Sequence, residues 1–221
     1  MVKISPTLIG LSLTLIAPPF LAMWGNRIFT NPESIASKCW QQFFLVLLFT
    51  AICCIVTFWE KQPLSSIGLH PFRLTSILWG LVFAVVLIFV YSPLLIKFIS
   101  WFDVSGFTNG LDKLAPLPLW YLVMAVIIGG IVEEVLYRGY ATEQLALLTG
   151  NYWIGSAIAL IAFGLAHVPI WGWVPGLTTI LSGGLLTLLY LGTGDLLSSI
   201  VAHIVTDSVG IILPVFNSRH R

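Results

Sequence analysis

Long apolar runs are the feature that most constrains what this chain can fold into. Runs of roughly 17–25 residues, the length that crosses a bilayer as a helix, recur along the whole sequence. Polar connections separate them, and the longest, residues 102–118, is expected to form an interfacial helix or a lid. The seven expected spans are residues 7–24, 40–59, 74–100, 118–141, 151–168, 173–191 and 196–216.

Composition points to the same class of protein. The chain of 221 residues is 58% hydrophobic and only 9% charged, whereas a soluble domain carries about 25% charged residues. Most tryptophans fall near the ends of expected spans, as in the aromatic belts of membrane proteins. The sequence therefore predicts an all-α, polytopic transmembrane helix bundle. A net charge of +1 without a basic block gives no indication of nucleic-acid binding.

Charged residues interrupt the fourth expected span near its end. Glu133, Glu134 and Arg138 follow a run, Trp120–Ile128, that carries no charge. Ionisable side chains in such segments are costly and face protein or water rather than lipid. Glu134 and Arg138 are four residues apart and can pair, whereas Glu133 points about 100° away and has no partner in its own segment. The alternatives are a snorkelling cluster at a helix end and a polar site.

Two later spans carry histidine at similar depth. His167 ends the fifth run just before Pro169, a position where a structural hydrogen bond is the more common role. His203 and Asp207 share one face of the last span, because they are four residues apart. Asp195, about two to three turns earlier, is an expected helix N-cap. Asp207 can hold His203 in one tautomer, or both can face a shared cavity.

Three spans thus supply two glutamates, two histidines, an arginine and an aspartate. Glutamate and histidine suit general acid–base chemistry, and histidine with carboxylates also suits zinc. The sequence has no Gly-x-Ser-x-Gly elbow and no HExxH helix, so a serine nucleophile has little support. Buried carboxylates and imidazoles also form proton relays, which leaves a proton-coupled carrier as an alternative, although no inverted repeat is visible.

Taken in order, these motifs resemble a known family. Glu133-Glu134-x-x-x-Arg138, Phe163-x-x-x-His167 and His203-x-x-x-Asp207 resemble the signature of the CPBP intramembrane proteases. That family includes the type II CAAX prenyl endopeptidases and bacterial proteins first named for bacteriocin processing and self-immunity. The resemblance covers roughly residues 115–216, so we divide the single membrane domain into N-terminal helices, 1–114, and a catalytic core, 115–221, with four helices.

The resemblance implies an intramembrane endopeptidase in which Glu133 and His167 activate water. His203 and Asp207 would stabilise the oxyanion, while Glu134, Arg138 and Phe163 would support the site. The fourth position of the last motif is most familiar as asparagine, whose amide donates hydrogen bonds. Asp207 as a carboxylate cannot donate, so it is either protonated or orients His203.

Further expectations concern partners and compartment. We expect a peptide or protein substrate in or at the membrane, a lipid bilayer around the helices, and no cofactor, with zinc as the alternative. A second hypothesis is a catalytically silent immunity protein that binds peptides in the same cavity. The short, loop-poor chain favours an integral protein of a bacterial cytoplasmic membrane.

Overall fold

The computed structural model describes residues 5–28, 31, 33–101 and 112–218, and all regular structure in these ranges is helical. The seven predicted spans are confirmed by helices that are long and apolar enough to cross a membrane. These are Pro6–Trp24, Ile35–Trp59, Leu74–Phe98, Leu119–Thr149, Tyr152–Pro169, Trp173–Thr193 and Leu196–Asn217. The fourth extends well beyond its predicted end, and most of the expected interfacial helix or lid lies outside the described residues.

The individual elements subdivide these spans. In chain order they are α1 Pro6–Ile28, α2 Ile35–Cys54, η1 Ile55–Trp59, η2 Leu64–Ile67, α3 Leu74–Val86, η3 Leu87–Tyr91, α4 Ser92–Ile99, α6 Leu119–Glu133, η4 Glu134–Ala141, α7 Thr142–Thr149, α8 Tyr152–Trp171, α9 Trp173–Thr193, α10 Leu196–Asp207, η5 Ser208–Ile212 and α11 Leu213–Ser218.

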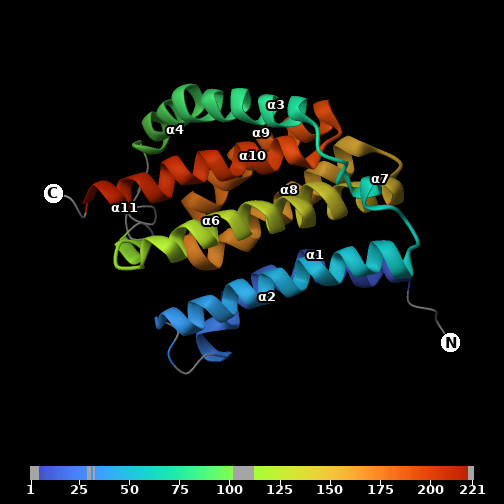
Figure 1. Cartoon of the computed structure of the whole chain (residues 1–221), viewed down its shortest axis with the longest axis horizontal. Helices are drawn as coiled ribbons and strands as arrows, with labels where there is room; N and C mark the ends of the chain where they lie inside the picture. The colour runs from blue at the N-terminus through green and yellow to red at the C-terminus, as the bar shows by residue number, and fades with distance from the viewer. Residues whose placement is uncertain (1–4, 29–30, 32, 102–111, 219–221) are drawn as a thin grey trace.

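The long helices run side by side along the longest axis of the molecule (Figure 1). α10 packs between α3 and α6, and α6 in turn packs against α2. α8 packs closely against both α7 and α9. This order brings the charged end of α6 between the histidine-bearing helices, although their sequences are far apart.

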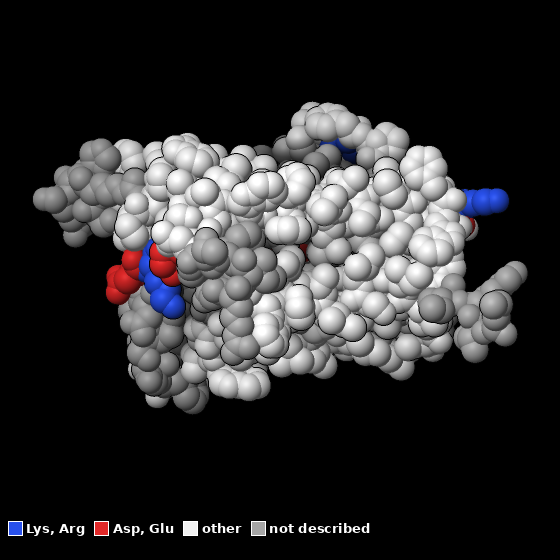
Figure 2. All heavy atoms as spheres, turned by 90° about the horizontal axis from the view of Figure 1, so that it is seen from below, with Lys and Arg blue, Asp and Glu red and all other residues white. Residues whose placement is uncertain are grey.

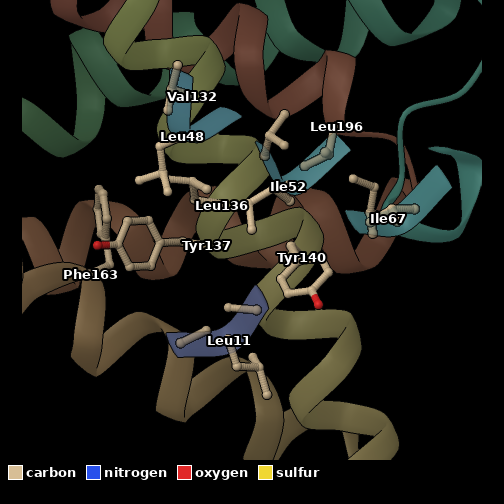
Figure 3. Packing of buried hydrophobic residues seen from close by; sticks show 14 of the residues in the cluster. Leu11, Leu48, Ile52, Ile67, Val132, Leu136, Tyr137, Tyr140, Phe163 and Leu196 are labelled. Carbon is tan, nitrogen blue, oxygen red and sulfur yellow. The ribbon is translucent and has the colours of Figure 1, made fainter. Parts of the chain in front are cut away.

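The π-helical segment η4 lies at the centre of the hydrophobic core. All eight of its residues are buried, and the core around it draws side chains from both halves of the chain (Figure 3). Leu11 and Ile52 come from the N-terminal helices, while Leu196 comes from α10. Widened π-turns are rare and frequently occur at functional sites. Packing on every side therefore fixes the segment that begins at Glu134.

The outer surface suits a lipid environment. Large apolar side chains such as Trp79, Val82 and Phe89 are exposed on α3 and η3, which is expected where lipid replaces water. In Figure 2 the charged side chains lie mostly toward the two ends of the molecule, and the middle of this face is almost uncharged. We therefore describe the chain as an integral membrane protein.

Local capping signals place the ends of the site-bearing helices. The Asn151 side chain accepts hydrogen bonds from Trp153 N and Ile154 N and starts α8. Asp195 accepts from Leu197 N at 2.9 Å, which confirms the predicted N-cap of α10. Gly194 precedes it with φ of +64°, a left-handed conformation that glycine adopts without steric cost. The start of α10 fixes the depth of His203, two turns further on.

Candidate active site

Glu134 joins two helices at the buried side of the site. Its Oε1 atom accepts hydrogen bonds from Arg138 Nη1 at 2.9 Å and from His203 Nδ1 at 2.8 Å. The predicted pairing of Glu134 with Arg138 is therefore present, and both side chains are almost completely buried. The bond to His203 was not predicted, because it joins residues 69 positions apart and depends on how α10 packs against α6.

Arg138 is held by three different groups. Besides Glu134, its Nη2 atom donates to the Gly183 carbonyl oxygen at 3.0 Å. Its Cζ atom lies 4.2 Å from the centroid of the Phe163 ring, within the range of a cation–π contact. A buried charge needs such compensation, since an unpaired one is strongly destabilising. The guanidinium group consequently links η4 to both α8 and α9.

His167 is oriented by its own helix. Its Nδ1 atom lies 2.8 Å from the Phe163 carbonyl oxygen. Because a carbonyl can only accept, Nδ1 carries the hydrogen, and in the neutral ring Nε2 then holds the free lone pair. The Phe163 ring also contacts the His167 ring edge-on, with centroids 4.7 Å apart. Both contacts direct Nε2 away from α8 and toward Glu133.

Glu133 lies between the two histidines. Its Oε2 atom is 3.9 Å from Nε2 of His167 and 3.9 Å from Nε2 of His203. These separations are too long for direct hydrogen bonds, and no other described residue donates one to Glu133. A water molecule about 2.8 Å from each atom can bridge groups at this spacing. The carboxylate, 26% exposed, is therefore available to such a water.

Asp207 and Glu134 lie at different ring nitrogens of His203: Glu134 binds Nδ1, and Asp207 is close to Nε2. Its Oδ2 atom lies 3.4 Å from His203 Nε2, and its side chain is 38% exposed. The two residues are close, as their spacing predicted. The short bond to Nδ1 comes from Glu134, whereas Asp207 lies beside Nε2, so the role of Asp207 in orienting His203 stays a prediction. Glu133 Oε2 lies near the same nitrogen, at 3.9 Å.

The structure brings all the predicted site residues into one region, namely Glu133, Glu134, Arg138, Phe163, His167, His203 and Asp207. We call this set the polar centre. Within the described ranges, no group of three or more His, Cys, Asp or Glu side chains is arranged to hold a metal ion.

Two further residues of the region were missed in the sequence. Gly183 contributes only a backbone carbonyl, which no side-chain motif can indicate. Tyr137 directs its ring at Phe163, with centroids 5.0 Å apart (Figure 3). Its hydroxyl is buried without a hydrogen-bond partner among the described residues. Tyr137 occupies an unspecified position of the first motif, directly before Arg138. An aromatic residue at that position was the only feature of the sequence that could have indicated its place in the site.

Fold and polar centre together define a polytopic helical membrane protein with a carboxylate–histidine site shared by three spans. Residues 115–209 match the family model described as "Type II CAAX prenyl endopeptidase Rce1-like". The match confirms the resemblance seen in the three motifs, and the whole polar centre lies within it. This C-terminal part of the chain is thus similar to the Rce1-like endopeptidases. No curated protein and no solved structure matched the chain.

Proposed function

We propose that this protein is an intramembrane endopeptidase that hydrolyses a peptide bond of a membrane-associated peptide or a C-terminal tail. The observation that carries the proposal is the position of Glu133, whose Oε2 atom lies 3.9 Å from Nε2 of both histidines. Glu133 is thus separated from each imidazole by a distance that one bridging water molecule can span. The Rce1-like match over this segment supports proteolysis rather than transport.

In the proposed first step, a water held by Glu133 and His167 attacks the scissile carbonyl carbon. The Phe163 carbonyl keeps the hydrogen of His167 on Nδ1, so Nε2 accepts a hydrogen bond from the water. Glu133 takes one proton as the water oxygen forms its bond to carbon. When the carbon–nitrogen bond breaks, the protonated Glu133 returns that proton to the leaving amine.

His203 would stabilise the oxyanion that forms on the carbonyl oxygen. Its Nδ1–H is bound to Glu134, so the imidazolium form presents a second N–H at Nε2 toward the reaction space. A preoriented donor of this kind is worth far more in a water-poor site than in solution. Asp207 adds a second donor only in its protonated form, whereas an asparagine there would donate at any pH.

We propose that the reaction needs no metal ion. The Nδ1 atoms of both histidines are hydrogen-bonded within the protein, to the Phe163 carbonyl and to Glu134. In the proposed mechanism, Nε2 of His167 binds the attacking water and Nε2 of His203 binds the oxyanion. Metal analysis of purified, active protein tests this assignment. Cleavage that persists after chelation, without bound zinc, is the expected result. Stoichiometric zinc whose removal abolishes cleavage and whose return restores it would overturn the mechanism.

The substrate class and the compartment are proposals of the same kind. We propose a peptide or protein substrate that lies in or at the bilayer, and a bacterial cytoplasmic membrane as the location. The test compares peptides released by membranes that contain the protein, its Glu133→Gln variant, or neither. Release by the parent protein alone supports the proposal. Identical peptides from all three membranes, with both proteins folded, would instead indicate a catalytically silent binding protein.

A further inference from the structure

α9 contributes no residue to the motifs, yet one of its glycines touches the polar centre. Gly183 is buried in the middle of this helix. Its carbonyl oxygen accepts hydrogen bonds from Arg138 Nη2 at 3.0 Å and from Thr187 Oγ1 at 2.9 Å. The first bond connects α9 to η4 across 45 positions of sequence. A backbone group on a neighbouring helix therefore takes part in holding the buried guanidinium.

The missing side chain of Gly183 matters as much as its carbonyl. A Cβ atom at this position would lie 2.7 Å from Arg138 Nη2 and 3.0 Å from two ring carbons of Phe163. Carbon atoms do not approach other heavy atoms this closely without displacing them. Arg138 cannot retreat freely, because its side chain is 2% exposed and Nη1 is bound to Glu134. Any side chain at position 183 must move the guanidinium or the ring.

Displacement at this point would reach both histidines. Arg138 shares Glu134 Oε1 with His203 Nδ1, so a shift of the guanidinium changes the position of the acceptor that orients His203. Phe163 holds His167 in two ways, by its carbonyl oxygen and by its ring. Gly183 is thus connected to His203 through Arg138 on η4, and to His167 through Phe163 on α8.

We propose that Gly183 is a positioning residue for the proposed hydrolysis. By its carbonyl and its lack of a side chain, it seats Arg138 against Phe163 and so sets the orientation of His203 and His167. The inference rests on the proposed function for its effect on rate. Its effect on the geometry of the two imidazoles does not depend on which reaction they perform.

The next residue in the helix provides a matched control. A Cβ atom at Gly184 would meet only Leu160 Cδ2, at 3.5 Å, which is an ordinary van der Waals contact. Gly183→Ala and Gly184→Ala make the same chemical change in the same helix, and both gain the same intrinsic helix propensity. A difference between the two variants therefore reports the contacts of Gly183 with Arg138 and Phe163.

The first measurement is kcat and KM per folded protein for the parent and both alanine variants. A misplacement approaching 1 Å in a catalytic group costs about 100-fold in rate. We expect kcat of Gly183→Ala to fall by about 10- to 100-fold with KM little changed. Gly184→Ala should keep the parent kcat. Equal kcat values for the two variants would overturn the proposal.

The second measurement follows the histidines directly by NMR of ¹⁵N-labelled imidazoles in detergent. The Nδ1 signal of His203 should move in Gly183→Ala and stay in place in Gly184→Ala. Arg138→Lys serves as a second variant if Gly183→Ala does not fold, because lysine lacks the fork that reaches both Glu134 and Gly183. It should reproduce the loss of kcat and the shift of His203. Parent-like values in both readouts would refute the inference.

The two proposals fail in different ways. If the parent protein and Glu133→Gln do not differ in cleavage, the proposed hydrolysis fails, while the NMR comparison still decides whether Gly183 orients the histidines. If Glu133→Gln is inactive but Gly183→Ala matches Gly184→Ala in kcat and in its His203 signal, the inference about Gly183 alone is wrong.

Discussion

Two carboxylates near the ends of η4 have opposite surroundings. Glu60 accepts hydrogen bonds from Thr7 Oγ1 at 3.0 Å, Tyr140 OH at 2.7 Å and Gln144 Nε2 at 3.4 Å. Glu133 accepts none from the described residues, and its nearest polar neighbours are two imidazole nitrogens at 3.9 Å. Glu60 joins α1, η4 and α7 to the end of the second span, whereas Glu133 joins nothing directly.

The difference indicates which carboxylate is structural and which is available for chemistry. A carboxylate surrounded by neutral donors is stabilised in place, because each bond to a charged group contributes more than an ordinary one. One without donors must be solvated, and it can exchange a proton with its neighbours. Glu143 resembles Glu60, since it accepts from Tyr190 OH at 2.6 Å and from Tyr152 OH at 2.7 Å.

Glu133→Gln should show the largest effect, on rate alone. The amide cannot take a proton from water, and loss of a general base typically lowers kcat by about 10²- to 10⁴-fold. Thermal unfolding in detergent should match that of the parent, since no described residue loses a hydrogen bond. If Glu133→Gln retains cleavage, Glu133 is not the general base, and the functional difference proposed between Glu133 and Glu60 is wrong.

Glu134→Gln should reduce stability by about 3–5 kcal/mol, because it leaves the buried Arg138 without its counter-charge. The amide nitrogen of the glutamine would take the place of Oε2, which is buried and has no hydrogen-bond partner among the described residues. It would therefore be a buried donor without an acceptor. Unfolding midpoints of the two glutamine variants, measured in the same detergent, test the assignment. A larger loss of stability for Glu133→Gln would mean that the two glutamates have been assigned the wrong roles.

Tyr140→Phe should lower stability by about 1.5 kcal/mol, because it removes a partly buried hydrogen bond to the Glu60 carboxylate. Tyr152→Phe is the control, as it also removes a tyrosine–glutamate bond but at a side chain that is 52% exposed. Its effect should be smaller, since solvent replaces the lost donor. Cleavage per folded molecule should be unaffected in Tyr140→Phe; a loss of kcat there would link Glu60 to catalysis.

Asp207→Asn should have the smallest effect on stability, within about 0.5 kcal/mol, because the side chain is partly exposed and forms no buried pair. The amide can donate to the oxyanion, so we expect kcat at least equal to that of the parent. Steady-state kinetics check this. A sharp fall in kcat would show that the carboxylate itself is needed beside His203 Nε2.

Much of the fold followed from local sequence. The bilayer sets the length of every span, so apolar runs located all seven helices. The pairing of Glu134 with Arg138 and the cap at Asp195 were also predictable, because helix geometry fixes contacts three or four residues apart. The π-turns of η4 were not anticipated. The fourth span was expected to end at residue 141, where η4 ends, but α7 continues the helix to Thr149.

The ordered motifs alone selected the residues of the polar centre and their resemblance to a protease family. Only the tertiary structure decided how these residues are connected: that Glu134 rather than Asp207 binds His203 Nδ1, and that the Gly183 carbonyl holds Arg138. The physical reason is that both contacts cross between helices. Their geometry depends on how far each helix is rotated and translated against its neighbours, which side-chain packing determines and spacing within one helix does not.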